Sequence, residues 1–230
     1  MKPIHALAVS LLLLACAPRS SVDASPETMP FEAELLTAAR EFKTWDRVSD
    51  RANWSPLDCL APVPAGVLSS ESKDTGTHGR KLYFLYAKDG ELYDELSLWS
   101  SPSDDPDGFA DLSQRMVGQV LVKESFTSVE VDPDTVPRRQ AAAIGARHVP
   151  DDYLLDGERA YRAGDSGALF VMLKLEPGTP GTDEGWVYGT LTADGTRVTA
   201  SGRIESCMDC HVDEGRDRMY GHRRPRQLAR

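Results

Sequence analysis

The chain has 230 residues, of which 40% are hydrophobic and 27% are charged, a composition typical of a globular protein with one core. Lys and Arg together number 26 and Asp and Glu number 36, so the formal net charge is −10 at pH 7. Because binding to phosphate backbones requires clustered cations, this acidic balance excludes nucleic acid as the expected partner.

The N-terminus has the pattern of a signal peptide over residues 1–15. Its apolar run, about 12 residues long, fits an export signal and is too short to span a bilayer. The run ends in Leu-Leu-Ala-Cys, which resembles a bacterial lipobox, and this resemblance implies cleavage before Cys16 and a lipid on its thiol. Because Ala17 follows, the resemblance implies a lipid anchor at the periplasmic face of the outer membrane of a Gram-negative bacterium. A plain secretory peptide with an incidental cysteine is the alternative.

The following segments differ in composition. Residues 16–30, rich in Ser, Pro and Ala, are predicted to be a flexible tether. Residues 31–80 are expected to hold an N-terminal helix and an irregular extension, residues 81–222 the main domain, and residues 223–230 a basic tail.

The pattern of apolar residues predicts an α+β fold that is mainly antiparallel β, a twisted meander preceded by an amphipathic helix. Residues 30–48 carry apolar side chains at helical spacing and predict about four helical turns. The stretch 90–99 favours a short helix over a strand, 100–109 indicates a loop, and Asp132–Asp165 is expected to be a long polar excursion. Strands are predicted at 80–89, 117–131, 166–177 and 185–198, the last with an Asp-Gly turn.

The four cysteines decide the chemistry of the C-terminal segment, because Cys207, Cys210 and His211 form a Cys-x-x-Cys-His motif. A zinc site would need a second pair of ligands, and a thioredoxin-like dithiol would need a βαβ context. Attachment of a c-type haem fits: two thiols at i and i+3 can bond the two vinyl groups of one porphyrin edge, and His211 can ligate the iron. A disulfide or an adventitious metal is the alternative. Cys59 is either a buried thiol or a partner in an intermolecular disulfide.

Four features in order resemble the cytochrome P-460 family and its relative cytochrome c-prime-beta, over about Lys81 to Tyr220. They are the strand "KLYFLYAKDGELY", the pattern G-x-x-x-V-K-E at 118–124, the pair "ALFVMLKLEPG" and "EGWVYG", and the haem motif followed by Asp-x-x-aromatic at 217–220. The resemblance implies a small antiparallel β fold, usually a homodimer. It also implies one covalent haem c per chain, five-coordinate and high-spin, with a distal side open to a small ligand.

Lys123, the lysine of the V-K-E pattern, is the residue on which the resemblance bears most. Hydroxylamine-oxidising members cross-link this lysine to the porphyrin, whereas the c-prime-beta branch has an apolar distal pocket and binds nitric oxide. Alternation puts Lys123 on the face of Leu121 and Ser125 without deciding whether that face meets the haem, and an outward-pointing lysine is the alternative. The candidates for lining the distal pocket, which are equally candidates for the core, are Phe84, Tyr86, Phe126 and Phe170.

We expect the protein to be an exported mono-haem cytochrome that binds hydroxylamine or nitric oxide. If it is an enzyme, it would also oxidise this ligand. Oxidation would require an electron acceptor such as a second cytochrome, and the sequence leaves open whether there is turnover. One alternative is an electron carrier whose sixth ligand would be His78, His148, His222, Met116 or Met172. The others are a non-catalytic gas-binding haem lipoprotein and a haem-free lipoprotein. The basic tail is expected to be solvated. The alternatives are that it docks an acidic partner cytochrome, or that Arg216 and Arg218 bind haem propionates.

Overall fold

The computed structural model describes residues 29–48, 68–69, 81–98, 103–136, 153–156, 158–212 and 217–219. Several predictions fall outside these residues: those on the signal peptide, Cys16, Cys59, His78, His148, His222, Arg216, Tyr220 and the basic tail. Within the described part of the chain, no helix is long and apolar enough to cross a membrane.

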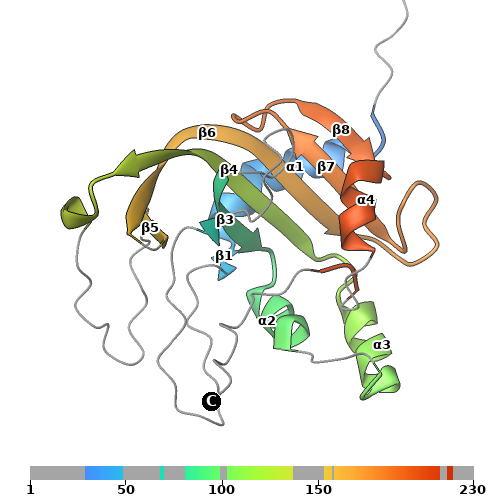
Figure 1. The fold of residues 1–230 in the computed structure, drawn as a ribbon. Helices are drawn as coiled ribbons and strands as arrows, with labels where there is room; N and C mark the ends of the chain where they lie inside the picture. Colours follow the sequence, from blue (N-terminus) through green and yellow to red (C-terminus); the bar gives the residue numbers. More distant parts are fainter. Residues whose placement is uncertain are drawn as a thin grey trace, which may run out of the picture.

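One antiparallel sheet forms the centre of the described structure (Figure 1). Its strands are β1 (Asp46–Arg47), β2 (Leu68–Ser69), β3 (Lys81–Ala87), β4 (Val120–Val131), β5 (Tyr153–Asp156), β6 (Arg159–Lys174), β7 (Trp186–Leu191) and β8 (Val198–Gly202). The strand order is β1-β3-β4-β6-β7-β8, with β2 beside β3 and β5 beside β6. Each of these pairings is antiparallel, which confirms the predicted fold class.

The helices are α1 (Glu32–Glu41) with the 3₁₀ turn η1 (Phe42–Thr44), α2 (Gly90–Leu98), α3 (Pro106–Arg115), the 3₁₀ turn η3 (Pro133–Thr135) and α4 (Glu205–His211). The short helix favoured at 90–99 is α2. The N-terminal helix is shorter than predicted. After η1 the chain becomes extended at Trp45 and enters β1, where Asp46 pairs with Ala87 of β3. Sheet pairing therefore ends the helical pattern early.

The loop predicted at 100–109 is wrong over its second half, because α3 begins at Pro106. The carboxylate of Asp105 accepts a hydrogen bond from the backbone N–H of Gly108 at 3.0 Å and caps the helix. Pro106 stands in the first turn, where a proline has no helical hydrogen bond to lose. The Asp-Pro pair is thus a helix start.

The polar excursion predicted at Asp132–Asp165 also contains strand. β6 begins at Arg159 and pairs with β4 as far as the Val131–Ala160 pair, and β5 adds a further strand beside it. In Figure 1 this end of β4 and β6 extends away from α2, α3 and α4. Because most side chains in the first half of β6 are exposed or only partly buried, this part of the strand lacks the apolar alternation that indicates a strand.

The sheet carries a buried cluster on each of its faces. On the α1 face, Leu35 of α1 packs against side chains that include Tyr86 and Val122. On the opposite face, which we call the α4 face, α2, α3 and α4 pack against side chains that include Leu121 and Tyr188. Figure 1 shows α1 and α4 on opposite sides of the strands. The sheet is therefore covered by helices on both sides, and the side chains of β3, β4, β6 and β7 alternate between the two clusters.

Candidate haem-attachment site

The Cys-x-x-Cys-His motif forms the C-terminal part of α4, a seven-residue helix that packs on the α4 face. Residues three apart on a helix are neighbours on its surface, so Cys207 and Cys210 share one side of α4. Both are thiols; Cys207 is half-buried against the cluster on the α4 face, and Cys210 is exposed. Burial raises the pKa of the Cys207 thiol above its ordinary value.

The imidazole of His211 is held in one orientation by a backbone carbonyl. Its Nδ1 lies 2.6 Å from the carbonyl oxygen of Arg218, and since a carbonyl only accepts, Nδ1 carries the proton and donates. The Tyr188 ring packs beside it, with 5.5 Å between ring centroids. This hydrogen bond leaves Nε2 as the nitrogen with a lone pair for iron. Two thiols on one side of a helix and a histidine in this tautomer fit a covalently attached haem.

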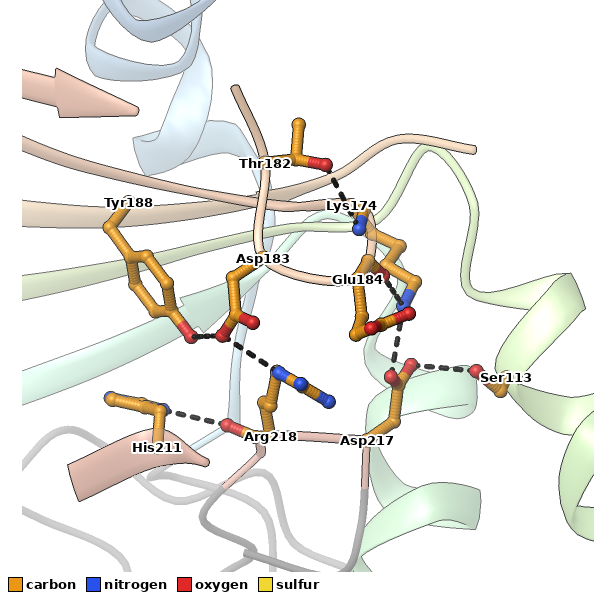
Figure 2. A network of polar contacts seen from close by, with 10 residues as sticks. Ser113, Lys174, Thr182, Asp183, Glu184, Tyr188, His211, Asp217 and Arg218 are labelled. Atoms are coloured by element: carbon orange, nitrogen blue, oxygen red, sulfur yellow. Dashed lines mark hydrogen bonds and ion pairs between the residues drawn. The ribbon is translucent and has the colours of Figure 1, made fainter. Parts of the chain in front are cut away.

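The carbonyl belongs to a short segment, Asp217–Met219, which we call the strap. Asp217 and Arg218 have φ values of 48° and 61°, in the left-handed region that costs a non-glycine residue roughly 1–3 kcal/mol. Two polar anchors, shown in Figure 2, and one buried side chain hold this conformation. Arg218 Nε donates to Asp183 Oδ2 at 2.7 Å, Asp217 Oδ1 lies 2.9 Å from Lys174 Nζ, and Met219 is buried in the cluster on the α4 face.

Asp183 is the centre of the first anchor. It lies just before β7, where its backbone exchanges hydrogen bonds of 2.8 Å with that of Trp186. Its Oδ2 also accepts a hydrogen bond from the hydroxyl of Tyr188 at 3.0 Å. Burial raises the pKa of Asp183, but the hydrogen bonds from Arg218 and Tyr188 outweigh burial and leave the pKa below its ordinary value. Asp183 is therefore an ionised partner for Arg218.

Lys174 is the centre of the second anchor. Its side chain is 1% exposed and that of Asp217 is 7% exposed, so the two form a buried ion pair. Lys174 Nζ also donates to the carbonyl of Glu184 at 2.9 Å, and Asp217 Oδ2 accepts from Ser113 Oγ of α3 at 2.9 Å. The strap is thus tied to β6 and to α3 as well as to β7.

Lys123 lies on the α4 face of β4, two residues from Leu121 and opposite Phe170 of β6. Its Nζ lies 4.2 Å from the centroid of the Tyr83 ring and 5.8 Å from that of Phe170. Burial, followed by the positive charge of Lys81, lowers the pKa of Lys123 to about 8. A substantial fraction of the amine is therefore neutral near pH 8, on the face that carries the attachment helix.

The structure separates the four aromatic residues named as pocket candidates. Phe84, Tyr86 and Phe126 pack in the cluster on the α1 face, so they do not lie on the side of the sheet that carries α4. Phe170 faces Lys123 on the α4 face. Phe84 and Tyr86 alternate with Leu85 along β3, and Phe126 of β4 pairs with Leu82 of β3, which lies in the same cluster.

Other predicted residues are placed as follows. Met172 lies partly buried on the α4 face, and Met116 is fully buried at the end of α3. Nε of the Arg218 guanidinium pairs with Asp183, and the propionate-binding role of this residue stays a prediction. Sequence reasoning missed Asp183, Lys174 and Tyr188. No local pattern marks them, since each acts on a residue at least 23 positions away.

No model of a known protein family matches the chain, and a search of curated proteins finds no match either. The relation to the P-460 family therefore stays a proposal that depends on the residues described above.

Proposed function

We propose that this protein is an exported c-type mono-haem cytochrome of the P-460 type, which binds, and with an electron acceptor oxidises, hydroxylamine or nitric oxide. The single observation that carries the proposal is the arrangement at α4, where two thiols share one side of the helix and the tautomer of His211 is set by a carbonyl. The lipid anchor at Cys16, the periplasmic location and a homodimer belong to the same proposal.

In this proposal each residue has a distinct role. Cys207 and Cys210 hold the porphyrin by thioether bonds, and His211 binds the iron through Nε2. When bound, the haem would supply an iron site for the small nitrogen ligand and the redox chemistry for its oxidation. Lys123 presents an amine of lowered pKa on the same face of the sheet. A partly neutral lysine in an aromatic setting is suited to act as a nucleophile or to tune its surroundings.

An electron carrier with a six-coordinate haem is the second candidate. The observation that favours it is Met172, a possible thioether ligand that lies partly buried on the α4 face and pairs with Tyr188 across β6 and β7. The two candidates differ in coordination number, which an absorption spectrum measures directly.

The test is to mature the chain with a c-type haem assembly system and to record its spectrum oxidised and reduced. We expect one covalent haem per chain, lost in a Cys207→Ser/Cys210→Ser variant, and a high-spin spectrum. A ferrous Soret band shifted far to the red would indicate a modified macrocycle, which Lys123→Ala should abolish and the neighbouring Lys81→Ala should leave in place.

Other spectra would point elsewhere. An ordinary high-spin spectrum would remove the cross-link and favour reversible nitric oxide binding. Sharp low-spin bands, lost in Met172→Ala, would favour the electron carrier. A chain that emerges from the assembly system without covalent haem would overturn the proposal.

A further inference from the structure

The Nδ1–H of His211 donates to the carbonyl of Arg218, whose position the local backbone does not favour. Asp217 and Arg218 are consecutive non-glycine residues in the left-handed region, and the carbonyl of Arg218 is the acceptor for His211 Nδ1 at 2.6 Å. A segment of this kind persists only where its surroundings hold it. The contacts of the strap are therefore responsible for where this carbonyl lies.

The side chain and the backbone carbonyl of Arg218 contact different parts of the fold. The guanidinium is drawn to Asp183, on the turn before β7, while the carbonyl points to His211 on α4 (Figure 2). Asp183 is itself fixed, by its backbone pairing with Trp186 and by the hydroxyl of Tyr188. Tyr188 in turn packs its ring beside the imidazole. Asp183, Tyr188, Arg218 and His211 thus form a continuous chain of contacts from the sheet to the candidate iron ligand.

We propose that Asp183, Tyr188 and Arg218 are positioning residues that set the strength of His211 as an iron ligand by holding the Arg218 carbonyl against Nδ1. This inference rests on the proposed haem attachment. A hydrogen bond accepted from Nδ1–H makes the imidazole a stronger donor, which strengthens its bond to iron and favours the ferric state. Loosening the strap weakens that hydrogen bond, so the iron–histidine bond weakens and the reduction potential rises.

If these residues acted on the iron only through their charges, the shifts of the reduction potential would differ from those expected for positioning. The two explanations can therefore be tested against each other. Asp183→Asn removes a negative charge near the site and would raise the potential, whereas Arg218→Gln removes a positive charge and would lower it. Positioning moves the potential upward in both variants. Tyr188→Phe changes no charge and keeps the ring beside His211, and it removes only the hydrogen bond to Asp183. It is the mildest of the three variants and the one expected to disturb folding least.

The experiment measures two properties of the matured, haem-loaded protein: the iron–histidine stretching frequency of the ferrous form by resonance Raman spectroscopy, and the midpoint potential. We expect a lower stretching frequency and a higher potential in all three variants, with the smallest shifts in Tyr188→Phe. The control is Arg203→Gln, which removes a positive charge close to Asp183 but leaves the strap contacts in place, because Arg203 donates to the Thr182 carbonyl. In this control the stretching frequency should not change.

The outcomes separate this inference from the proposed function. Shifts of potential with opposite sign in Asp183→Asn and Arg218→Gln, with an unchanged stretching frequency, would mean that only charge matters and would overturn the inference. An unchanged frequency in Tyr188→Phe together with either of the other variants would also overturn it. Both results leave haem attachment intact, whereas a parent protein without covalent haem would remove the proposed function and this inference together.

Discussion

Lys123 shows how the position of one side chain changes its chemistry. An exposed lysine is protonated at every physiological pH, because its unperturbed pKa is about 10.4. On the α4 face Lys123 lies among the rings of Tyr83 and Phe170 and close to the charge of Lys81. Burial among the rings removes water from the ammonium group, and the positive charge of Lys81 repels that group. Both effects favour the neutral amine. The pKa of about 8 that results is a property of the folded chain alone.

This difference predicts a pH-dependent stability. Between pH about 8 and about 10.4 the unfolded chain binds the proton more fully than the folded one, so the free energy of unfolding should rise with pH across this window. Below pH 8 the lysine is protonated in both the folded and the unfolded chain. The folded state then carries the full free-energy cost of burying the charged ammonium group. Lys123→Met should therefore be the more stable protein at pH 7, by about 1–3 kcal/mol, and the difference should shrink towards pH 10.

The measurement is urea unfolding of parent and variant at pH values from 7 to 10. Both carry Cys207→Ser and Cys210→Ser, so that no haem can react with the amine. Other titrating groups cancel in the difference between the two proteins. A difference that stays constant from pH 7 to pH 10 would contradict the lowered pKa of Lys123.

At the scale of elements, the strap connects parts of the chain that are far apart in sequence. Asp217 reaches Lys174 at the end of β6 and Ser113 on α3, while Arg218 reaches Asp183 before β7. A buried ion pair contributes little net stability when compared with a well-packed apolar pair. Removing one partner is different, because it leaves a buried charge without compensation. The pair is thus better at enforcing one arrangement of the strap than at adding stability.

Asp217→Asn should destabilise the protein by about 3 kcal/mol, because Lys174 then keeps a buried charge without its counterion. Asn also tolerates the left-handed backbone, so the change isolates the charge. The double variant Lys174→Met/Asp217→Asn should recover most of the loss. Urea unfolding followed by circular dichroism measures both effects.

The matched control is the exposed ion pair between Arg115 and Glu95, whose side chains are 45% and 46% exposed. Arg115→Gln should cost much less than Asp217→Asn, because water screens the charges of an exposed ion pair. If Asp217→Asn costs no more than this control, the ion pair of the strap does not behave as a buried one, and the proposed anchoring by β6 is wrong.

At the scale of the whole molecule, the sheet needs both of its helical layers. α1 covers one face, and its Leu35 is fully buried against β7. Gly189 of β7 makes this close approach possible: a Cβ at that position would lie 2.6 Å from Leu35 Cδ2. Since α4 and the strap rest on the opposite face, the α1 layer supports the candidate site only through the sheet. Changes at this contact should thus alter stability without altering the contacts of His211.

We expect Leu35→Ala to destabilise the protein by about 2–5 kcal/mol through a cavity, and Gly189→Ala by about 1–3 kcal/mol through overpacking. The double variant should cost less than the sum, because the new methyl group occupies part of the space that Leu35 leaves. Urea unfolding of the four proteins completes the cycle. Strict additivity would mean that α1 does not pack on β7 at this point.

Several elements follow from the sequence because their signals are local. Period-two alternation and β-rich composition identify β3, β4 and β7, and helical spacing identifies the start of α1. The Asp-Pro start of α3 is a local signal of a helix N-terminus, which the loop prediction at 100–109 does not take into account. The first part of β6 carried no such signal, because the ribbon that it forms with β4 is largely exposed.

By itself the sequence determined the fold class and the Cys-x-x-Cys-His motif, because periodicity and spacing within a few residues are enough to specify them. Only the tertiary structure decided which face of β4 carries Lys123, and that Phe84, Tyr86 and Phe126 lie on the other side. It also brought Asp183 and Lys174 to a strap 35 and 43 residues further along the chain. Alternation divides a strand into two faces without saying which one is covered by which helix. That choice depends on register, strand order and packing between distant residues, which the local pattern does not contain.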